Sequence, residues 1–166
     1  TLAYGSNLTA GSLLVATGRT GGGSALTFSD ATNGSWTAET SQTDQIGNIL
    51  WTSYFANNAS TTTLTVSAAW TGSTTFRWVI MEVTGAATSS PRDQYLTAND
   101  NTSQPASGAV TTLQDDEIVI GGCETDGPHT FQLGTGYTKV KFVPDSASCK
   151  MGVEYKIQTV AGSQNA

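Results

Sequence analysis

The sequence predicts an all-β protein, a two-sheet antiparallel β-sandwich with a jelly-roll-like arrangement. Three observations lead to this class. Apolar and polar residues alternate in about ten short segments, and no useful length of chain has the period of a helix. The 18 glycines supply turns between these segments. An apolar content of 37% suits strands that turn one face to the core and the other to water.

The first predicted strands lie near the N-terminus and end in a hairpin. An apolar-led strand covers residues 12–19, and in the next strand Leu26 and Phe28 alternate with polar residues. The Asn-Gly pair at 33–34 favours a tight turn, because both residue types tolerate positive φ. The return strand contains Trp36, which we expect to pack across the hairpin.

The strongest strand pattern of the sequence lies at residues 74–84. Phe76, Trp78 and Ile80 share one parity there, and the opposite parity is also largely apolar. Because both faces require burial, we predict that this strand is central in its sheet. We also predict that the three side chains lie between the two sheets.

The rest of the chain completes one domain over residues 1–166. Residues 86–107 form a long polar stretch around Pro91 and Pro105, and loops of this length in compact domains often carry function. The remaining predicted strands cover residues 48–57, 63–66, 108–113, 117–124, 130–133, 137–143 and 150–159.

Composition argues against several classes of function. The net charge is −6, whereas nucleic-acid binding requires clustered basic residues. The chain lacks an apolar run long enough to span a bilayer, so we expect no membrane insertion. Only 12% of the residues are charged and the single histidine, His129, follows a Gly-Pro turn, so we expect no enzyme activity. Glu82 and Glu154 keep a glycosidase as a minor alternative.

Calcium is the one cofactor that the sequence leaves open. Asp30, Asn33, Asp44 and Asn48 lie near predicted turns, and calcium takes oxygen ligands from loops. None of them belongs to a DxDxDG pattern. The alternative is that these side chains bond the backbone of their own turns.

Cys123 and Cys149 are the only two cysteines. Each lies at the edge of a predicted strand, and the two strands are plausible antiparallel neighbours. They form either a disulfide, which suits an oxidising compartment, or two separate thiols. The spacing does not fit a structural zinc site.

Aromatic residues outside the core are the candidates for ligand binding. Of the four tryptophans, Trp70 stands at a strand end, and Tyr95 lies in the long polar loop. Sugar rings pack against flat aromatic faces, while neighbouring polar groups such as Asn99 or Asp100 bond the hydroxyls. The alternative is that both rings cap the edge of the core.

Four segments, "LTAGSLLVA", "SDATNGSWT", "RWVIMEVTGAATSSPRDQ" and "SGAVTTLQDDEIVIGG", occur in an order that resembles one group of proteins. These are the β-sandwich modules appended to large secreted bacterial proteins and also found in phage structural proteins. The resemblance implies an extracellular, cell-surface or virion location. It also implies a strand before Leu2 and another after Ala166, so we expect a fragment lacking one or both outer strands, or an edge strand supplied by a partner.

These observations lead to one function and one alternative. We expect a non-catalytic glycan-binding or adhesion module of a secreted or surface protein, with a glycan or other surface polymer as its partner. The alternative is a virion structural protein, a capsid decoration or tail component, whose partners are other virion subunits.

Overall fold

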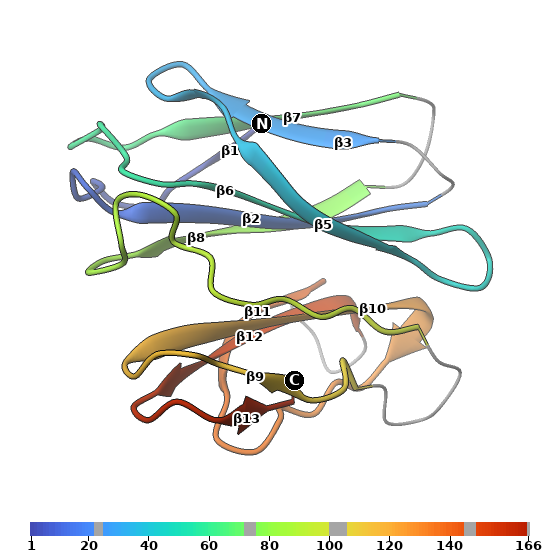
Figure 1. The fold of residues 1–166 in the computed structure, drawn as a ribbon. Helices are drawn as coiled ribbons and strands as arrows, with labels where there is room; N and C mark the ends of the chain where they lie inside the picture. The colour runs from blue at the N-terminus through green and yellow to red at the C-terminus, as the bar shows by residue number, and fades with distance from the viewer. Residues whose placement is uncertain (22–24, 72–75, 100–105, 145–148, 166) are drawn as a thin grey trace.

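The computed structural model describes residues 1–21, 25–71, 76–99, 106–144 and 149–165 (Figure 1). These residues form 13 strands and no helix, which confirms the predicted all-β class. In the same ranges, no helix is present that is long and apolar enough to cross a membrane.

The strands range from two residues in β1 to 13 residues in β10. In chain order they are β1 (Leu2–Ala3), β2 (Leu13–Thr20), β3 (Leu26–Asp30), β4 (Gly34–Ser35), β5 (Thr37–Thr43), β6 (Ile49–Phe55), β7 (Thr65–Trp70), β8 (Phe76–Val83), β9 (Val110–Thr111), β10 (Glu117–His129), β11 (Thr138–Val143), β12 (Cys149–Gln158) and β13 (Ser163–Gln164).

The strands form stacked antiparallel sheets. The first sheet has the order β1-β7-β3-β4, the second β5-β6-β2-β8 and the third β10-β12-β11, while β13 pairs with β9. Figure 1 shows the second sheet between the first, at the top, and the third, below it. The predicted sandwich is therefore present as the first and second sheets. The prediction of only two sheets was incomplete, because the third covers the other face of the second, and this strand order does not confirm a jelly roll.

An apolar core fills the space between the first and second sheets. Leu14 is fully buried there and Phe28 is 2% exposed. Phe76, Trp78 and Ile80 pack against this core, as the alternation in their strand predicted. The rings of Phe28 and Trp78 lie 5.5 Å apart between centroids, so the two sheets meet through aromatic contacts.

A second, smaller core lies between the second and third sheets. Val79, Met151 and Val153 are buried in it, and Leu50 and Ile120 pack around them. Val79 comes from β8, which therefore supplies side chains to both cores. This explains why both faces of that strand are apolar.

The prediction that residues 74–84 form a central strand was wrong. In the second sheet β8 is an edge strand, and β2 lies between β6 and β8. All eight residues of β2 are buried, including Thr17, Arg19 and Thr20. Layers above and below bury both faces of a strand whether or not it has lateral neighbours on both sides, so two apolar faces do not identify a central strand.

The predicted strand at 130–133 is a loop in the structure. Its Phe131 ring packs on Phe142 of β11 with 5.8 Å between centroids. A Cβ atom at Gly152 would lie 3.2 Å from Phe142 and 3.5 Å from Phe131. The loop is thus held by a ring contact over a glycine rather than by strand pairing.

The sequence left open whether the two cysteines form a disulfide. The structure has no disulfide at Cys123. In the pairing of β10 with β12, Cys123 lies opposite Gly152, whereas Cys149 lies opposite His129. The two strands are antiparallel neighbours as expected, but a register irregularity between Glu124 and His129 separates the two cysteine positions.

Candidate functional site

A pocket of about 260 Å³ lies between the outer strands of the second sheet and the long loop that follows β8. Its walls carry mostly polar side chains: Thr37, Ala38 and Glu39 of β5, Tyr54 of β6, and Ser90 and Arg92 of the loop. We call this the β5–loop pocket. It joins segments that are close to 40 and 90 in the sequence, so the fold rather than any local motif creates it.

A β-bulge in β5 sets the direction of the Glu39 side chain. Ala38 lies opposite Ser53 and Thr40 lies opposite Thr52, so Glu39 is the extra residue of a β-bulge. A bulge interrupts the in–out alternation and redirects the side chain of the inserted residue. Glu39 therefore reaches the loop from a strand whose other residues follow a regular pairing.

An ion pair crosses the pocket. The Nη1 atom of Arg92 donates to Oε1 of Glu39 at 2.7 Å, and this bond raises the pKa of the Arg92 guanidinium. The side chain of Arg92 is 48% exposed and that of Glu39 is 12% exposed. A guanidinium has five N–H donors, so this bond leaves most of them for other acceptors.

The loop enters the pocket through a strained residue. Ser90 has a φ of 46° and precedes Pro91. A non-glycine residue in this left-handed region costs about 1–3 kcal/mol, and it persists where the surroundings fix the backbone. Further along, Nδ2 of Asn99 donates to the carbonyl oxygen of Thr43 at 2.8 Å, and Oδ2 of Asp93 accepts from the backbone N–H of Leu113 at 2.7 Å. The first bond holds the loop against β5, and the second ties it to the segment between β9 and β10.

Tyr95 lies beside the β5–loop pocket and is 55% exposed. The guanidinium carbon of Arg92 stands 5.2 Å from the centroid of the Tyr95 ring, which is a cation–π contact. Of the site residues predicted from the sequence, Tyr95 thus contacts Arg92 of the pocket without lining it, and Asn99 anchors the loop. Asp100 lies outside the described residues.

Trp70 occupies a different part of the molecule. It ends β7 in the first sheet, is 39% exposed, and stacks on Phe76 of β8 with 4.7 Å between ring centroids. β8 and β5 are the two opposite edges of the second sheet. Trp70 and Tyr95 therefore belong to separate surfaces, and Trp70 extends the aromatic core to its rim.

None of the six described residues that line the pocket was predicted from the sequence, and they include Glu39, Tyr54 and Arg92. Ala38 is the one apolar residue of β5, so this strand has no alternation of apolar and polar residues in which the bulge at Glu39 could be seen. Arg92 offered a usable signal, because it is one of only seven basic residues and follows a proline in the long loop.

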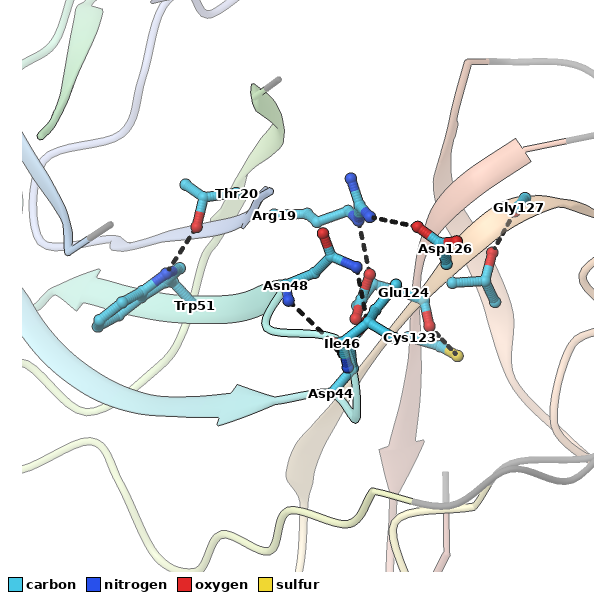
Figure 2. Close-up of polar contacts among 11 residues, drawn as sticks. Arg19, Thr20, Asp44, Ile46, Asn48, Trp51, Cys123, Glu124, Asp126 and Gly127 are labelled. Atoms are coloured by element: carbon cyan, nitrogen blue, oxygen red, sulfur yellow. Dashed lines mark hydrogen bonds and ion pairs between the residues drawn. The ribbon is translucent and has the colours of Figure 1, made fainter. Parts of the chain in front are cut away.

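A second polar cluster joins the second and third sheets (Figure 2). Nε of Arg19 on β2 donates to Oε2 of Glu124 on β10 at 2.6 Å, and Asp126 lies 3.9 Å from the same guanidinium. The side chains of Arg19 and Glu124 are only 4% and 7% exposed. Burial raises the pKa of Glu124, and the nearby charge of Asp44 adds to this effect, while Arg19 opposes it.

The candidate calcium ligands are engaged in turns. Oδ1 of Asp44 accepts the backbone N–H groups of Ile46 and Asn48 at 2.9 and 2.8 Å, and its Oδ2 accepts Nδ2 of Asn48 at 2.7 Å. Burial opposes ionisation of Asp44, but these bonds outweigh burial and lower its pKa. In the same way, Oδ1 of Asp30 accepts the backbone N–H groups of Thr32 and Asn33. Over the described ranges, no group of three or more His, Cys, Asp or Glu residues could hold a metal ion.

No family model, curated protein or solved structure matches this chain.

Proposed function

We propose that this chain is a non-catalytic glycan-binding module and that the β5–loop pocket is its binding site. The observation that carries the proposal is an exposed aromatic ring, Tyr95, beside the Arg92–Glu39 pair in a polar pocket. The C–H faces of a sugar pack on such a ring, and the ion pair offers both a donor and an acceptor to its hydroxyls. A small pocket with one exposed ring fits weak binding.

A binding role fits the pocket better than hydrolysis. Glycoside hydrolysis uses two carboxyl groups on either side of the scissile bond. Among the described residues that line the pocket, Glu39 supplies the one carboxylate, and Arg92 already occupies it. A module of this kind belongs to a secreted or cell-surface protein, and its partner is a glycan or a similar surface polymer.

Alanine substitutions at Arg92 and Tyr95 test the site. We expect each variant to lose about 5- to 30-fold in affinity for a retained polysaccharide, because a ring or charge-assisted contact contributes about 1–2 kcal/mol. The assay is affinity electrophoresis or pull-down on insoluble polysaccharides, with thermal unfolding as the check on folding. Lys141→Ala removes one exposed cation from β11 and serves as the matched control. Binding that is the same in both pocket variants and the control would rule out this site.

Trp70→Ala separates binding from packing. Because Trp70 stacks on Phe76 at the rim of the core, we expect this variant to lower the free energy of unfolding by about 1–2 kcal/mol. We expect its polysaccharide binding to stay unchanged, since the ring lies on the other edge of the second sheet from the pocket. Lost binding with unchanged stability would instead place the site at Trp70.

One observation favours the alternative of a virion structural protein. β8 is an edge strand of the second sheet among the described residues, and a groove of about 360 Å³ lies between it and the third sheet. Apolar side chains, including Met81, Val83 and Ile157, line this groove. An edge strand beside an apolar groove suits the addition of a strand from a neighbouring subunit. Ring-like or lattice assembly on sizing or in electron micrographs, without retention on polysaccharide, would favour this alternative.

A further inference from the structure

The β5–loop pocket holds one positive and one negative group that are already paired. Arg92 and Glu39 share a bond of 2.7 Å, and they are the only Asp, Glu, Lys or Arg residues among the described residues that line the pocket. The pocket is therefore close to electrically neutral, on a chain whose net charge is −6. A ligand that enters this pocket meets a donor and an acceptor side by side rather than an excess of positive charge.

Two adjacent hydroxyls of a sugar ring match this arrangement. Each hydroxyl donates and accepts, so one can accept from the guanidinium of Arg92 while its neighbour donates to the carboxylate of Glu39. Neighbouring ring hydroxyls lie about one hydrogen-bond length apart, which is also the separation of the two protein groups. The ligand can bridge the pair without breaking it.

An acidic sugar meets different conditions. Its carboxylate can bind Arg92 only by displacing Glu39 or by lying next to it, and like charges at contact distance repel. From this geometry we propose that the pocket selects neutral glycans with two adjacent free hydroxyls and rejects uronic acids. This inference rests on the proposed function, because it names the ligand class of the same site.

An array of immobilised glycans tests the inference with the wild-type chain. The array carries neutral hexose glycans, the same glycans with adjacent hydroxyls methylated, and glycans built from uronic acids. We expect binding to neutral members and at least fivefold weaker binding to the methylated and uronic members. Tighter binding to uronic members would overturn the inference and leave the proposed function in place, whereas binding to no member would count against both.

Glu39→Gln provides a second test on the same array. This variant keeps an acceptor oxygen but leaves Arg92 without its counter-charge. We expect weaker binding to neutral glycans and a gain of at least fivefold for uronic members, with a salt dependence that the wild-type chain lacks. Lys141→Gln, which changes the charge by the same amount in the opposite sense on β11, is the control. An unchanged preference in Glu39→Gln would overturn the inference.

Discussion

Replacement of Arg19 by methionine is expected to lower the free energy of unfolding at pH 7 by about 3–5 kcal/mol. Arg19 is 3% exposed, and its guanidinium is the cation bonded to the buried carboxylate of Glu124. Removal of one member of a buried ion pair leaves the other as an uncompensated charge in a medium of low polarity. The two residues also join β2 to β10, so the loss falls on the contact between the second and third sheets.

The deficit of Arg19→Met, meaning its loss in the free energy of unfolding relative to the wild type, should depend on pH. Burial already raises the pKa of Glu124, and without Arg19 the pKa rises further. A group whose pKa is raised in the folded state contributes stability at low pH, and this contribution is lost as the pH rises through the folded pKa. We therefore expect the deficit to shrink when the pH falls from 7 toward the ordinary pKa of a glutamate. Urea unfolding at several pH values measures it.

Two further variants complete this test. In the double variant Arg19→Met, Glu124→Leu, both charges are replaced by apolar groups, and we expect most of the lost stability to return. Lys141→Met removes an exposed cation of β11 and measures the effect of losing a surface charge on the free energy of unfolding. A loss below about 1 kcal/mol in Arg19→Met, or a deficit that is the same at every pH, would show that the pair does not stabilise the junction between the sheets.

The parts of the fold that follow from local patterns could be predicted. A hairpin does form at the predicted Asn-Gly pair, but its loop is residues 31–33: Asp30 of β3 lies opposite Gly34 of β4, and of the pair only Gly34 has a positive φ. The alternation of Phe76, Trp78 and Ile80 did identify the face that packs against the first core. Both signals arise within a few residues, where turn chemistry and strand parity act directly.

The third layer could not be predicted in this way. The strand at residues 12–19 was predicted, but nothing in the sequence indicated that its polar residues Thr17 and Arg19 are buried on β2. The carboxylate that compensates Arg19 is Glu124, 105 residues later in the chain. A polar residue can be assigned to the interior only when its partner is known, and here the partner comes from another sheet.

The candidate site also has one part that could be predicted from the sequence and one part that could not. Tyr95 and Asn99 were predicted because they lie in a long polar loop, and the structure places that loop along β5. Glu39 and Tyr54 depend on the bulge in β5 and on the pairing of β5 with β6, which involve residues far from the loop in sequence. The composition of the sequence thus indicated the half of the surface that the loop provides, but not the half that the sheet provides.

The largest remaining effect on stability is expected for Asp30→Ala, with a loss of about 3–4 kcal/mol. Asp30 is 7% exposed. Its Oδ2 accepts Nε1 of Trp36 at 2.7 Å and Nδ2 of Asn33 at 3.1 Å, and its Oδ1 accepts the backbone N–H groups of Thr32 and Asn33 at 2.8 and 2.7 Å. The substitution removes all four acceptor contacts and leaves the indole N–H of the buried Trp36 unpaired. Hydrogen bonds to charged groups contribute more to stability than neutral ones. The loss in the free energy of unfolding is therefore larger than for a turn residue that makes only neutral hydrogen bonds.

A double-mutant cycle with Trp36→Phe identifies the indole bond within this total. If the bond between Asp30 and Trp36 carries a large share, Asp30→Ala should cost at least about 1 kcal/mol less in the Trp36→Phe background than in the wild type. Asp30→Asn keeps one acceptor oxygen and should recover part of the loss, because the turn N–H groups can still be bonded. Chemical unfolding followed by tryptophan fluorescence gives the free energy of unfolding of the wild type and of each variant. Equal costs of Asp30→Ala in both backgrounds would show that the carboxylate stabilises the turn alone and does not hold Trp36 in the core.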